Sequence, residues 1–395
     1  MKILKTSWML VLLFTTNITF SQSQKVNIPD YYLEAAIRGN MDKPTGDLTT
    51  KDLESFTRFV AIGRNITDLT GLEHAKNLTA LYLDNNKLTN LQPLANLHKL
   101  KSLSLNGNLI VNVQPLAQLT QLRQLALDRN KIKDIGALKT LQNLKGVTFN
   151  FNQISEISAV SHWKKLTYFN MAFNRLQDLT PLRNLTSLIG IWIPDNQVSN
   201  IEVLNKLTKL EILILEKNKV TDIKVLQYLP KLVQLNLMDN LISDFSVLQK
   251  LPQVGALVLR KSRLRKLDFL KNMKSLEWLD LRDNQIRDIS ALKGLYRLKK
   301  LFVANNQIAS LKPINNLRQL RWLNIANNQI KYLAPIAEMP NLTDLTLCNN
   351  PASDSKQPQT TQILQTLKSR VPGFSVSDCK VGSIYQMEPS RAFKK

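Results

Sequence analysis

The chain has 395 residues, of which 44% are hydrophobic, so it can bury a sizeable core. Its 53 Lys and Arg against 30 Asp and Glu give a formal net charge of +23, which favours anionic partners but carries no information about the fold. No motif joins His74, His98 or His162 to a Cys or a carboxylate pair, and no nucleotide-binding, serine-hydrolase or zinc-protease motif occurs, so we expect no enzyme activity, cofactor or metal.

Residues 1–21 have the pattern of a signal peptide. Lys2 and Lys5 give a basic start, an apolar run follows, and the small residues Thr19 and Ser21 suit a cleavage site. A membrane anchor is the alternative, but the apolar run is shorter than the roughly 18 residues of a spanning helix. We expect an exported protein, secreted, on the cell surface or in the periplasm, with no transmembrane span in its mature chain.

Two helices are expected within residues 22–56. Pro29 opens a helical pattern that Gly39 closes. Thr49 and Asp52 have the spacing of a capping box for a second helix. Both helices precede the repetitive part of the chain, so we expect them at one end of the molecule.

Residues 57–350 repeat every 22 positions. The pattern is L-x-x-L-x-L-x-x-N, as in Leu122, Leu125, Leu127 and Asn130. The Asn, here called the ladder Asn, recurs at 86, 108, 130, 152, 174, 196, 218, 240, 284, 306, 328 and 350. Ser262 occupies the one broken position, and Asn65 is interpreted as an earlier member. The pattern predicts about 14 coils, since one unit cannot bury its apolar face without neighbours.

Each L-x-L piece is predicted to form a short strand with alternate side chains facing the core. The ladder Asn turns the chain out of the strand, and its buried amide needs backbone partners in adjacent coils. Ser262 can supply only part of that hydrogen bonding.

The units resemble the 22-residue leucine-rich repeats of internalins, over about residues 25–380. The resemblance implies an α/β leucine-rich-repeat solenoid, a curved right-handed superhelix with a parallel β-sheet on its concave face and 3-10 or irregular turns on its convex face. It also implies that residues 22–56 are a helical N-terminal cap and that the concave face recognises macromolecules.

Residues 351–380 are expected to form a C-terminal cap whose helix ends at Pro372, and residues 381–395 a basic tail. Cys348 closes the last strand and Cys379 follows the helix. We favour a disulfide between them, a staple worth roughly 3–4 kcal/mol in the chain-entropy model. Two free thiols are the alternative.

A basic belt surrounds the broken ladder position. It consists of Arg260, Lys261, Arg263, Arg265, Lys266, Arg287 and Lys293. The belt is either a solvated face of an elongated molecule or a site for an anionic polymer such as envelope polysaccharide. Few aromatic residues interleave with it, which argues against nucleic acid.

Residues six, four and two before each ladder position should line the concave face. Most units place small or polar residues there, but two groups differ. The first is Tyr168, Trp192, Ile212 and Ile214, with a recess at Gly190; the second is Trp278, Lys300, Phe302 and Trp322, with Asp280 and Arg282 as a polar rim.

Trp278, Lys300 and Trp322 are expected in one column on adjacent strands, where the Lys can make cation–π contacts. Cross-strand packing is the alternative reason for the aromatics. We favour a binding face, because coils with Ser and Ala need no aromatic there and Trp anchors interfaces.

The sequence thus predicts an exported, non-enzymatic leucine-rich-repeat protein that binds a protein, or a glycan, through its concave face. One alternative is a structural cell-envelope protein that binds anionic polymer through its basic surface, and such binding would fall steeply with salt. A second alternative, a cytosolic phosphatase-regulating repeat protein, shares the period, but the signal peptide argues against it.

Overall fold

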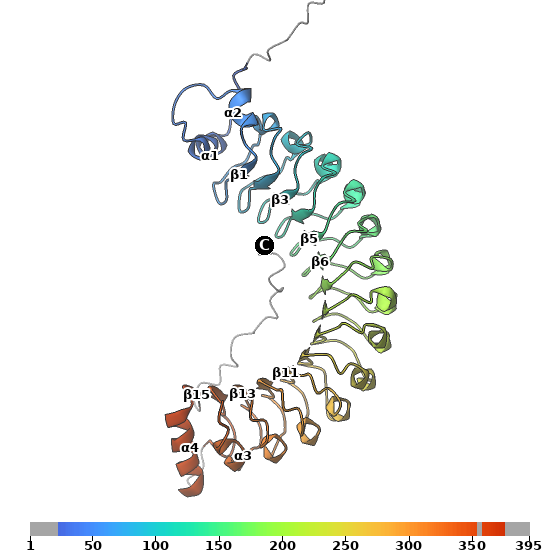
Figure 1. The fold of residues 1–395 in the computed structure, drawn as a ribbon, viewed down its shortest axis with the longest axis vertical. Coiled ribbons are helices and arrows are strands. Elements are labelled where there is room, and N and C mark those ends of the chain that lie inside the picture. The colour runs from blue at the N-terminus through green and yellow to red at the C-terminus, as the bar shows by residue number, and fades with distance from the viewer. Residues whose placement is uncertain (1–22, 354–357, 376–395) are drawn as a thin grey trace, which may run out of the picture.

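The computed structural model describes residues 23–353 and 358–375. The described chain forms an open arc, with short strands along its inner side and 3-10 helices along its outer side (Figure 1). One parallel sheet of 15 strands runs through the arc in chain order, from β1 to β15. This is the leucine-rich-repeat solenoid that the resemblance of the 22-residue units implies.

Every strand has three residues, because each coil contains one L-x-L piece. The strands are β1 Arg58–Val60, β2 Ala80–Tyr82, β3 Ser102–Ser104, β4 Gln124–Ala126, β5 Gly146–Thr148, β6 Tyr168–Asn170, β7 Gly190–Trp192, β8 Ile212–Ile214, β9 Gln234–Asn236, β10 Ala256–Val258, β11 Trp278–Asp280, β12 Lys300–Phe302, β13 Trp322–Asn324, β14 Asp344–Thr346 and β15 Gly373–Ser375. Paired residues of β1 to β14 lie 22 positions apart, as Trp278 with Lys300. Each position of the unit therefore forms a column across the sheet.

The outer side consists of 3-10 helices and one short α-helix. They are η1 Leu72–His74, η2 Gln92–Leu94, η3 Gln114–Gln118, η4 Gly136–Thr140, η5 Ser158–His162, η6 Thr180–Leu182, η7 Glu202–Lys206, η8 Lys224–Tyr228, η9 Ser246–Lys250, η10 Asp268–Leu270, η11 Ser290–Leu292, η12 Lys312–Ile314 and α3 Ala334–Ala337. The core lies between them and the sheet, where the central strand residues, such as Leu279, are fully buried. Trp163 takes a Leu position in this core and donates its indole N–H to the Leu138 carbonyl at 3.0 Å.

Helices cover the N-terminal end of the core. They are α1 Tyr31–Met41 and α2 Thr50–Glu54, and α2 has the expected capping box of Thr49 and Asp52. α1 extends past Gly39, because Asp42 (φ 53°) supplies the left-handed C-cap instead. Asp30 caps α1, and its second oxygen accepts the backbone N–H groups of Thr67 (2.7 Å) and Asp68 (3.1 Å) in the first coil.

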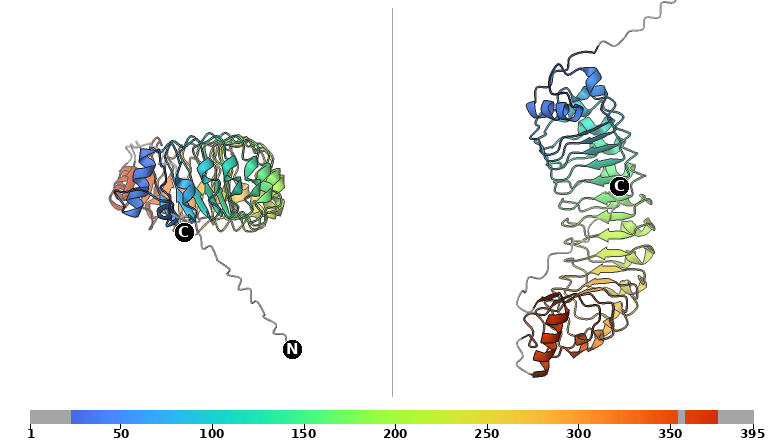
Figure 2. Two further views of the ribbon diagram at one scale, coloured as in Figure 1. Left: turned by 90° about the horizontal axis from the view of Figure 1, so that it is seen from above. Right: turned by 60° about the vertical axis from the view of Figure 1, so that its left-hand side comes forward.

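The C-terminal end is covered by α4 Pro358–Arg370, which buries Leu367 and is followed by β15 on the sheet edge. Figure 2 shows the blue helical segment at one end of the arc and the red helix α4 at the other. The predicted signal peptide 1–21, Cys379 and the basic tail 381–395 lie outside the described residues. Within residues 23–353 and 358–375, no helix combines the length and apolar character that crossing a membrane requires.

The ladder Asn side chains join successive coils. All twelve are buried, with exposed fractions of 3–9%. Asn174 is typical: its amide donates to the carbonyls of Phe149 (2.9 Å) in the preceding coil and Ala172 (3.1 Å) in its own. Its Oδ1 accepts the N–H of Ile154 at 2.9 Å. One side chain thus satisfies backbone groups from two coils, where the backbone lacks other partners.

The interpretation of Asn65 as a ladder residue is wrong. Asn65 is exposed and left-handed (φ 62°), and the 22-residue spacing from Asn86 leads to Arg64 instead. Because the first coil has no coil before it, no side chain is needed there to bridge backward. The ladder begins at Asn86, whose Oδ1 accepts the N–H groups of Arg64 and Ile66.

Replacement of a central ladder residue tests this role. We expect Asn174→Ala to lower the free energy of unfolding by about 1–3 kcal/mol, because buried backbone groups lose their partner. Denaturant unfolding of the variant and the wild type measures the difference. Equal unfolding midpoints would contradict the role of the ladder.

Asp30 predicts an acid-sensitive N-terminal cap. Burial raises the pKa of Asp30, but hydrogen bonds from Thr67, Leu33 and Asp68 outweigh it, so the pKa lies below its ordinary value of 3.8. The ionised side chain therefore contributes stability above the unfolded-state pKa of about 3.9, and this contribution is lost as the pH falls through the lower folded-state pKa.

We expect Asp30→Asn to lower the melting temperature at neutral pH and to reduce the loss of stability below about pH 4. Melting curves across pH for the wild type, Asp30→Asn and the control Asp239→Asn, which alters an exposed aspartate, measure the effect. Parallel curves for the wild type and Asp30→Asn would exclude this contribution.

Candidate binding face on the concave sheet

The inner side of the arc presents the first and third residues of each strand. The register places Trp278, Lys300 and Trp322 on three adjacent strands in one column, as the spacing predicts. All three are half-buried, while the residue that follows each of them is in the core. Alternation along each strand therefore turns this column away from the core.

Lys300 lies between the two indoles. Its Nζ is 4.9 Å from the ring centroid of Trp278 and 4.5 Å from that of Trp322. Phe302 contacts Trp278 edge-on, with ring centroids 6.5 Å apart. Burial of the ammonium lowers the pKa of Lys300 from its ordinary value. The result is an aromatic surface that holds a cation by cation–π attraction.

A cavity of about 490 Å³ opens beside this column. Its walls include Gln234, Glu277, Trp278, Lys299, Lys300 and Trp322. Glu277 accepts from Lys299 Nζ at 2.8 Å, and this contact is the main cause of its lowered pKa. The cavity thus combines an aromatic wall with groups of both charges, at a size typical of ligand pockets.

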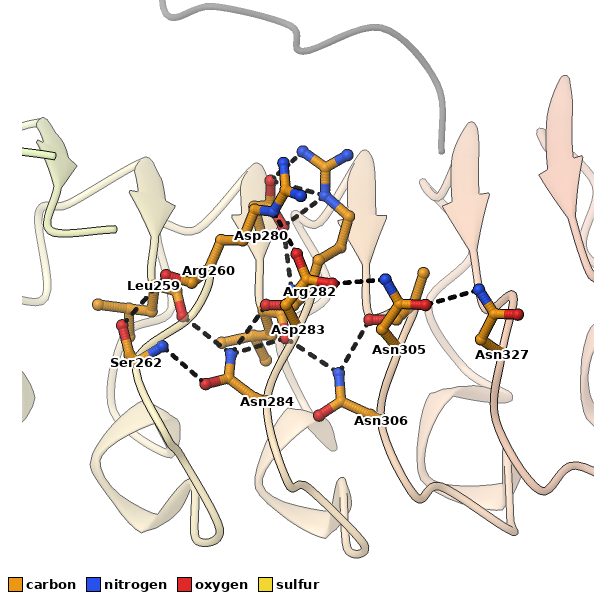
Figure 3. Close-up of polar contacts among 12 residues, drawn as sticks. Leu259, Arg260, Ser262, Asp280, Arg282, Asp283, Asn284, Asn305, Asn306 and Asn327 are labelled. Atoms are coloured by element: carbon orange, nitrogen blue, oxygen red, sulfur yellow. Dashed lines mark hydrogen bonds and ion pairs between the residues drawn. The ribbon is translucent and has the colours of Figure 1, made fainter. Parts of the chain in front are cut away.

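The prediction that Asp280 and Arg282 form an exposed polar rim is wrong. The structure buries both residues, with exposed fractions of 3% and 6%. They lie two residues apart on one side of β11 and its extension, so Arg282 Nε donates to Asp280 Oδ1 at 2.9 Å and Nη2 donates to Oδ2 at 2.5 Å (Figure 3). The guanidinium also lies 5.3 Å from the Phe302 ring centroid. The pair packs against Phe302 instead of framing an exposed patch.

The first predicted group also differs from expectation. Trp192, Ile212 and Ile214 pack against each other and are only 4–5% exposed, with Tyr168 against them. The recess at Gly190 is not open, because the Trp192 ring lies over it, where a Cβ at residue 190 would clash. Gly190 is required by this close approach.

The basic belt is only partly free. Lys261, Arg263, Arg265, Lys266, Arg287 and Lys293 are exposed. Arg260 is not, because its side chain pairs with Asp283 of the next coil (Figure 3). Arg265 and Arg287 are each held to a neighbouring Gln, at positions 285 and 307. The belt therefore retains its positive surface at these six residues, while the charge of Arg260 is paired with a carboxylate.

Cys348 is 1% exposed and is disulfide-bonded. Its neighbours in the sheet column are Ala304 and Ala326. Because Cys379 lies outside the described residues, the pairing of these two cysteines stays a prediction.

One exposed aromatic pair was not anticipated. Phe151 and Phe173 stack with centroids 4.2 Å apart, and Arg129 lies 4.7 Å from the Phe151 ring. All three precede a ladder Asn and have positive φ, between 54° and 55°. The sequence signal for this pair is a Phe immediately before the ladder Asn in two successive coils. Other coils carry Gly, Asn or a charged residue at that position.

Comparisons with known proteins agree with this fold. A model described as leucine-rich repeats (2 copies) matches residues 98–140, 208–250 and 274–316. No curated protein matches the chain. A leucine-rich-repeat protein of Leptospira interrogans is 24% identical, with 82% of this chain and 96% of the other covered and a TM-score of 0.72. A plant peptide hormone receptor, RGFR1, solved in complex with RGF2, is 16% identical, with 71% and 53% covered and a TM-score of 0.58. Both share the fold.

A closer similarity defines the family. The structure of an internalin (inlF) from Listeria monocytogenes is 31% identical, with a TM-score of 0.77. The match covers 80% of this chain and 95% of that one. The chain belongs to the internalin-like leucine-rich-repeat proteins of bacteria.

Proposed function

We propose that this chain is an exported, non-enzymatic binding protein that recognises a protein partner through Trp278, Lys300, Phe302 and Trp322 of its concave face. The internalin-like fold makes the chain a protein-binding scaffold, and the finer statement rests on the residues of this face. The signal-peptide pattern of residues 1–21 supports export.

The observation that carries the proposal is the Trp278–Lys300–Trp322 column. Two indoles and a partly desolvated ammonium stand on the side of the sheet that faces away from the core. Ser102 and Gln124 occupy the same column in β3 and β4, so the solenoid forms without aromatics there. Large aromatic side chains beside a cavity with polar walls are the composition of an interface anchor.

A second feature of the same face supports a partner. Trp192 Nε1 is buried and has no acceptor within the described residues. A buried donor without an acceptor costs about 1–3 kcal/mol. A bound backbone carbonyl that reaches this indole would remove the cost. The plant receptor RGFR1, which has this fold, was solved in complex with RGF2.

A structural envelope role is the second candidate, favoured by the six exposed belt cations on two neighbouring coils. Binding of an anionic polymer by these cations depends on charge alone, so it falls steeply with ionic strength. Binding at the aromatic column does not. Capture of partners by the mature chain at about 0.15 M and 1 M salt therefore separates the two candidates.

Substitution of the column tests the proposal. We expect Trp278→Ala or Trp322→Ala to weaken binding of the captured partner by about 2 kcal/mol or more, roughly thirtyfold in Kd. Unfolding stability should change by less than about 1 kcal/mol, because no core contact is lost. Titration against the partner and thermal unfolding of the same variants are the two measurements.

Tyr228→Ala is the matched control, since Tyr228 is an exposed aromatic of η8 on the outer side of the arc. This variant should bind as the wild type does. Strong destabilisation of Trp278→Ala with unchanged affinity would reduce the column to cross-strand packing. Capture that disappears at high salt and with Arg263, Arg265 and Arg287 changed to Glu would establish the envelope role instead.

A further inference from the structure

One coil boundary lacks the ladder Asn. At every other described boundary the ladder Oδ1 accepts the N–H of the residue 20 positions earlier, as Asn240 does from Val220 at 3.0 Å. At Ser262 that residue is Ile242, and its N–H has no acceptor within the described residues. The hydroxyl of Ser262 lies 3.5 Å from the Arg260 carbonyl instead.

A second inter-coil hydrogen bond is missing at the same boundary. In the preceding coil, Leu241 N–H donates to the Val220 carbonyl at 2.9 Å. The equivalent bond, from Arg263 N–H to the Ile242 carbonyl, is absent from the described structure. The strands remain paired here, because β9 and β10 keep their register. The two described coils are therefore hydrogen-bonded through their strands but lack both inter-coil hydrogen bonds after the turn at Ser262.

The backbone at Ser262 has the conformation of a first coil. Lys261 (φ 53°) and Arg263 (φ 55°) flank Ser262 in the left-handed region. Among the described coils, only the first shares this arrangement, with Gly63 (φ 65°) and Asn65 (φ 62°) around position 64. In both places the N–H of the central residue donates to the next ladder Asn at 3.0 Å. The Ser262 coil thus repeats the start of the solenoid in the middle of the array.

In the first coil, two amides that follow this turn bind a carboxylate. Asp30 Oδ2 accepts the backbone N–H groups of Thr67 (2.7 Å) and Asp68 (3.1 Å), three and four residues after position 64. The corresponding residues after Ser262 are Arg265 and Lys266. Neither N–H makes a hydrogen bond within the described residues. These two positions lack a hydrogen-bond acceptor in the described coils from Asn86 to Asn328 as well, so the Ser262 coil is set apart by what lies beside them.

A cavity of about 640 Å³ lies at this boundary. It has an apolar floor and a basic margin: Ile242, Phe245, Leu264, Phe269, Arg263, Arg265 and Lys266 line it, together with Asp244 and Asp268. Ile242 and Leu264 are 8% and 5% exposed, whereas Val220 and Ile286 at the matching positions of intact coils are fully buried. The missing ladder Asn has opened the core to this cavity. Both carboxylates of the lining already have partners: Asp244 accepts the N–H of Ser246, and Asp268 accepts from Lys271 Nζ.

We propose that this cavity binds a small carboxylate with an alkyl or aryl tail. The carboxylate takes the N–H groups of Arg265 and Lys266, as Asp30 takes their counterparts, and the guanidinium groups of Arg263 and Arg265, which also line the cavity, lie beside it. The tail lies on the apolar floor that the broken ladder exposes. Charge-assisted hydrogen bonds and apolar burial thus act on the two ends of one ligand. This site is separate from the concave face.

Calorimetric titration of the mature chain with octanoate tests the proposal, with acetate and octanol as the probes that lack the tail or the charge. We expect saturable binding of one octanoate per chain, and affinities at least about tenfold lower for acetate and octanol. Ser262→Asn restores the missing acceptor, closes the cavity and should abolish octanoate binding while raising the melting temperature. Arg265→Gln should weaken octanoate binding by about tenfold.

Arg287→Gln is the matched control, because Arg287 occupies the same position of the next coil and makes the same contact to a Gln. It should bind octanoate as the wild type does, and so should Trp322→Ala on the concave face. Absence of saturable binding to the wild type would overturn the proposal. Equal affinity of Ser262→Asn and wild type, or equal weakening by Arg265→Gln and Arg287→Gln, would also overturn it.

Discussion

The amide of the ladder Asn is the interaction on which the rest of this structure depends. Strands of three residues supply few backbone hydrogen bonds, and the chain leaves the sheet after each one. Buried N–H and C=O groups at that turn need partners, and an Asn side chain provides both a donor and an acceptor. Each one bonds to its own coil and to the one before, as Asn174 does with Ala172 and Phe149. Stacking at a fixed 22-residue interval follows from this repeated bridge.

Fixed stacking has a consequence for binding. Alternate strand residues line up in columns on the inner side of the arc, where core packing does not constrain the residue type. The two aromatic groups use that freedom differently. Trp192 folds over Gly190 and closes its own recess, whereas Trp278 and Trp322 stand apart around Lys300 beside an open cavity. The second group is therefore the better candidate for a partner's anchor.

Periodicity predicted the strands, the ladder and the Trp278–Lys300–Trp322 column, because a constant register converts spacing in the chain into neighbours in space. It could not predict burial on that face. Asp280 and Arg282 lie on the concave side as expected, but they pair with each other and are buried there instead of forming an exposed rim. The role of Asn65 was misjudged because Asn65 lies one residue past the ladder position of the first coil, which the 22-residue spacing places at Arg64. Ser262 predicted the loss of hydrogen bonds at its coil boundary. The left-handed conformation of Arg263 and the cavity could not be predicted, because they follow from how the backbone adjusts to that loss.

Hydrogen exchange at single amides tests the ladder most directly, because it reads the bond that each Asn makes. The N–H groups of Val220 and Leu264 donate to ladder Asn side chains, whereas that of Ile242, between them in the array, faces Ser262. All three side chains are at least nine-tenths buried, so burial alone predicts similar protection. If the ladder holds the coils together, Ile242 exchanges much faster than Val220 and Leu264, and Ser262→Asn restores its protection. Equal protection of the three amides in the wild type would contradict this account.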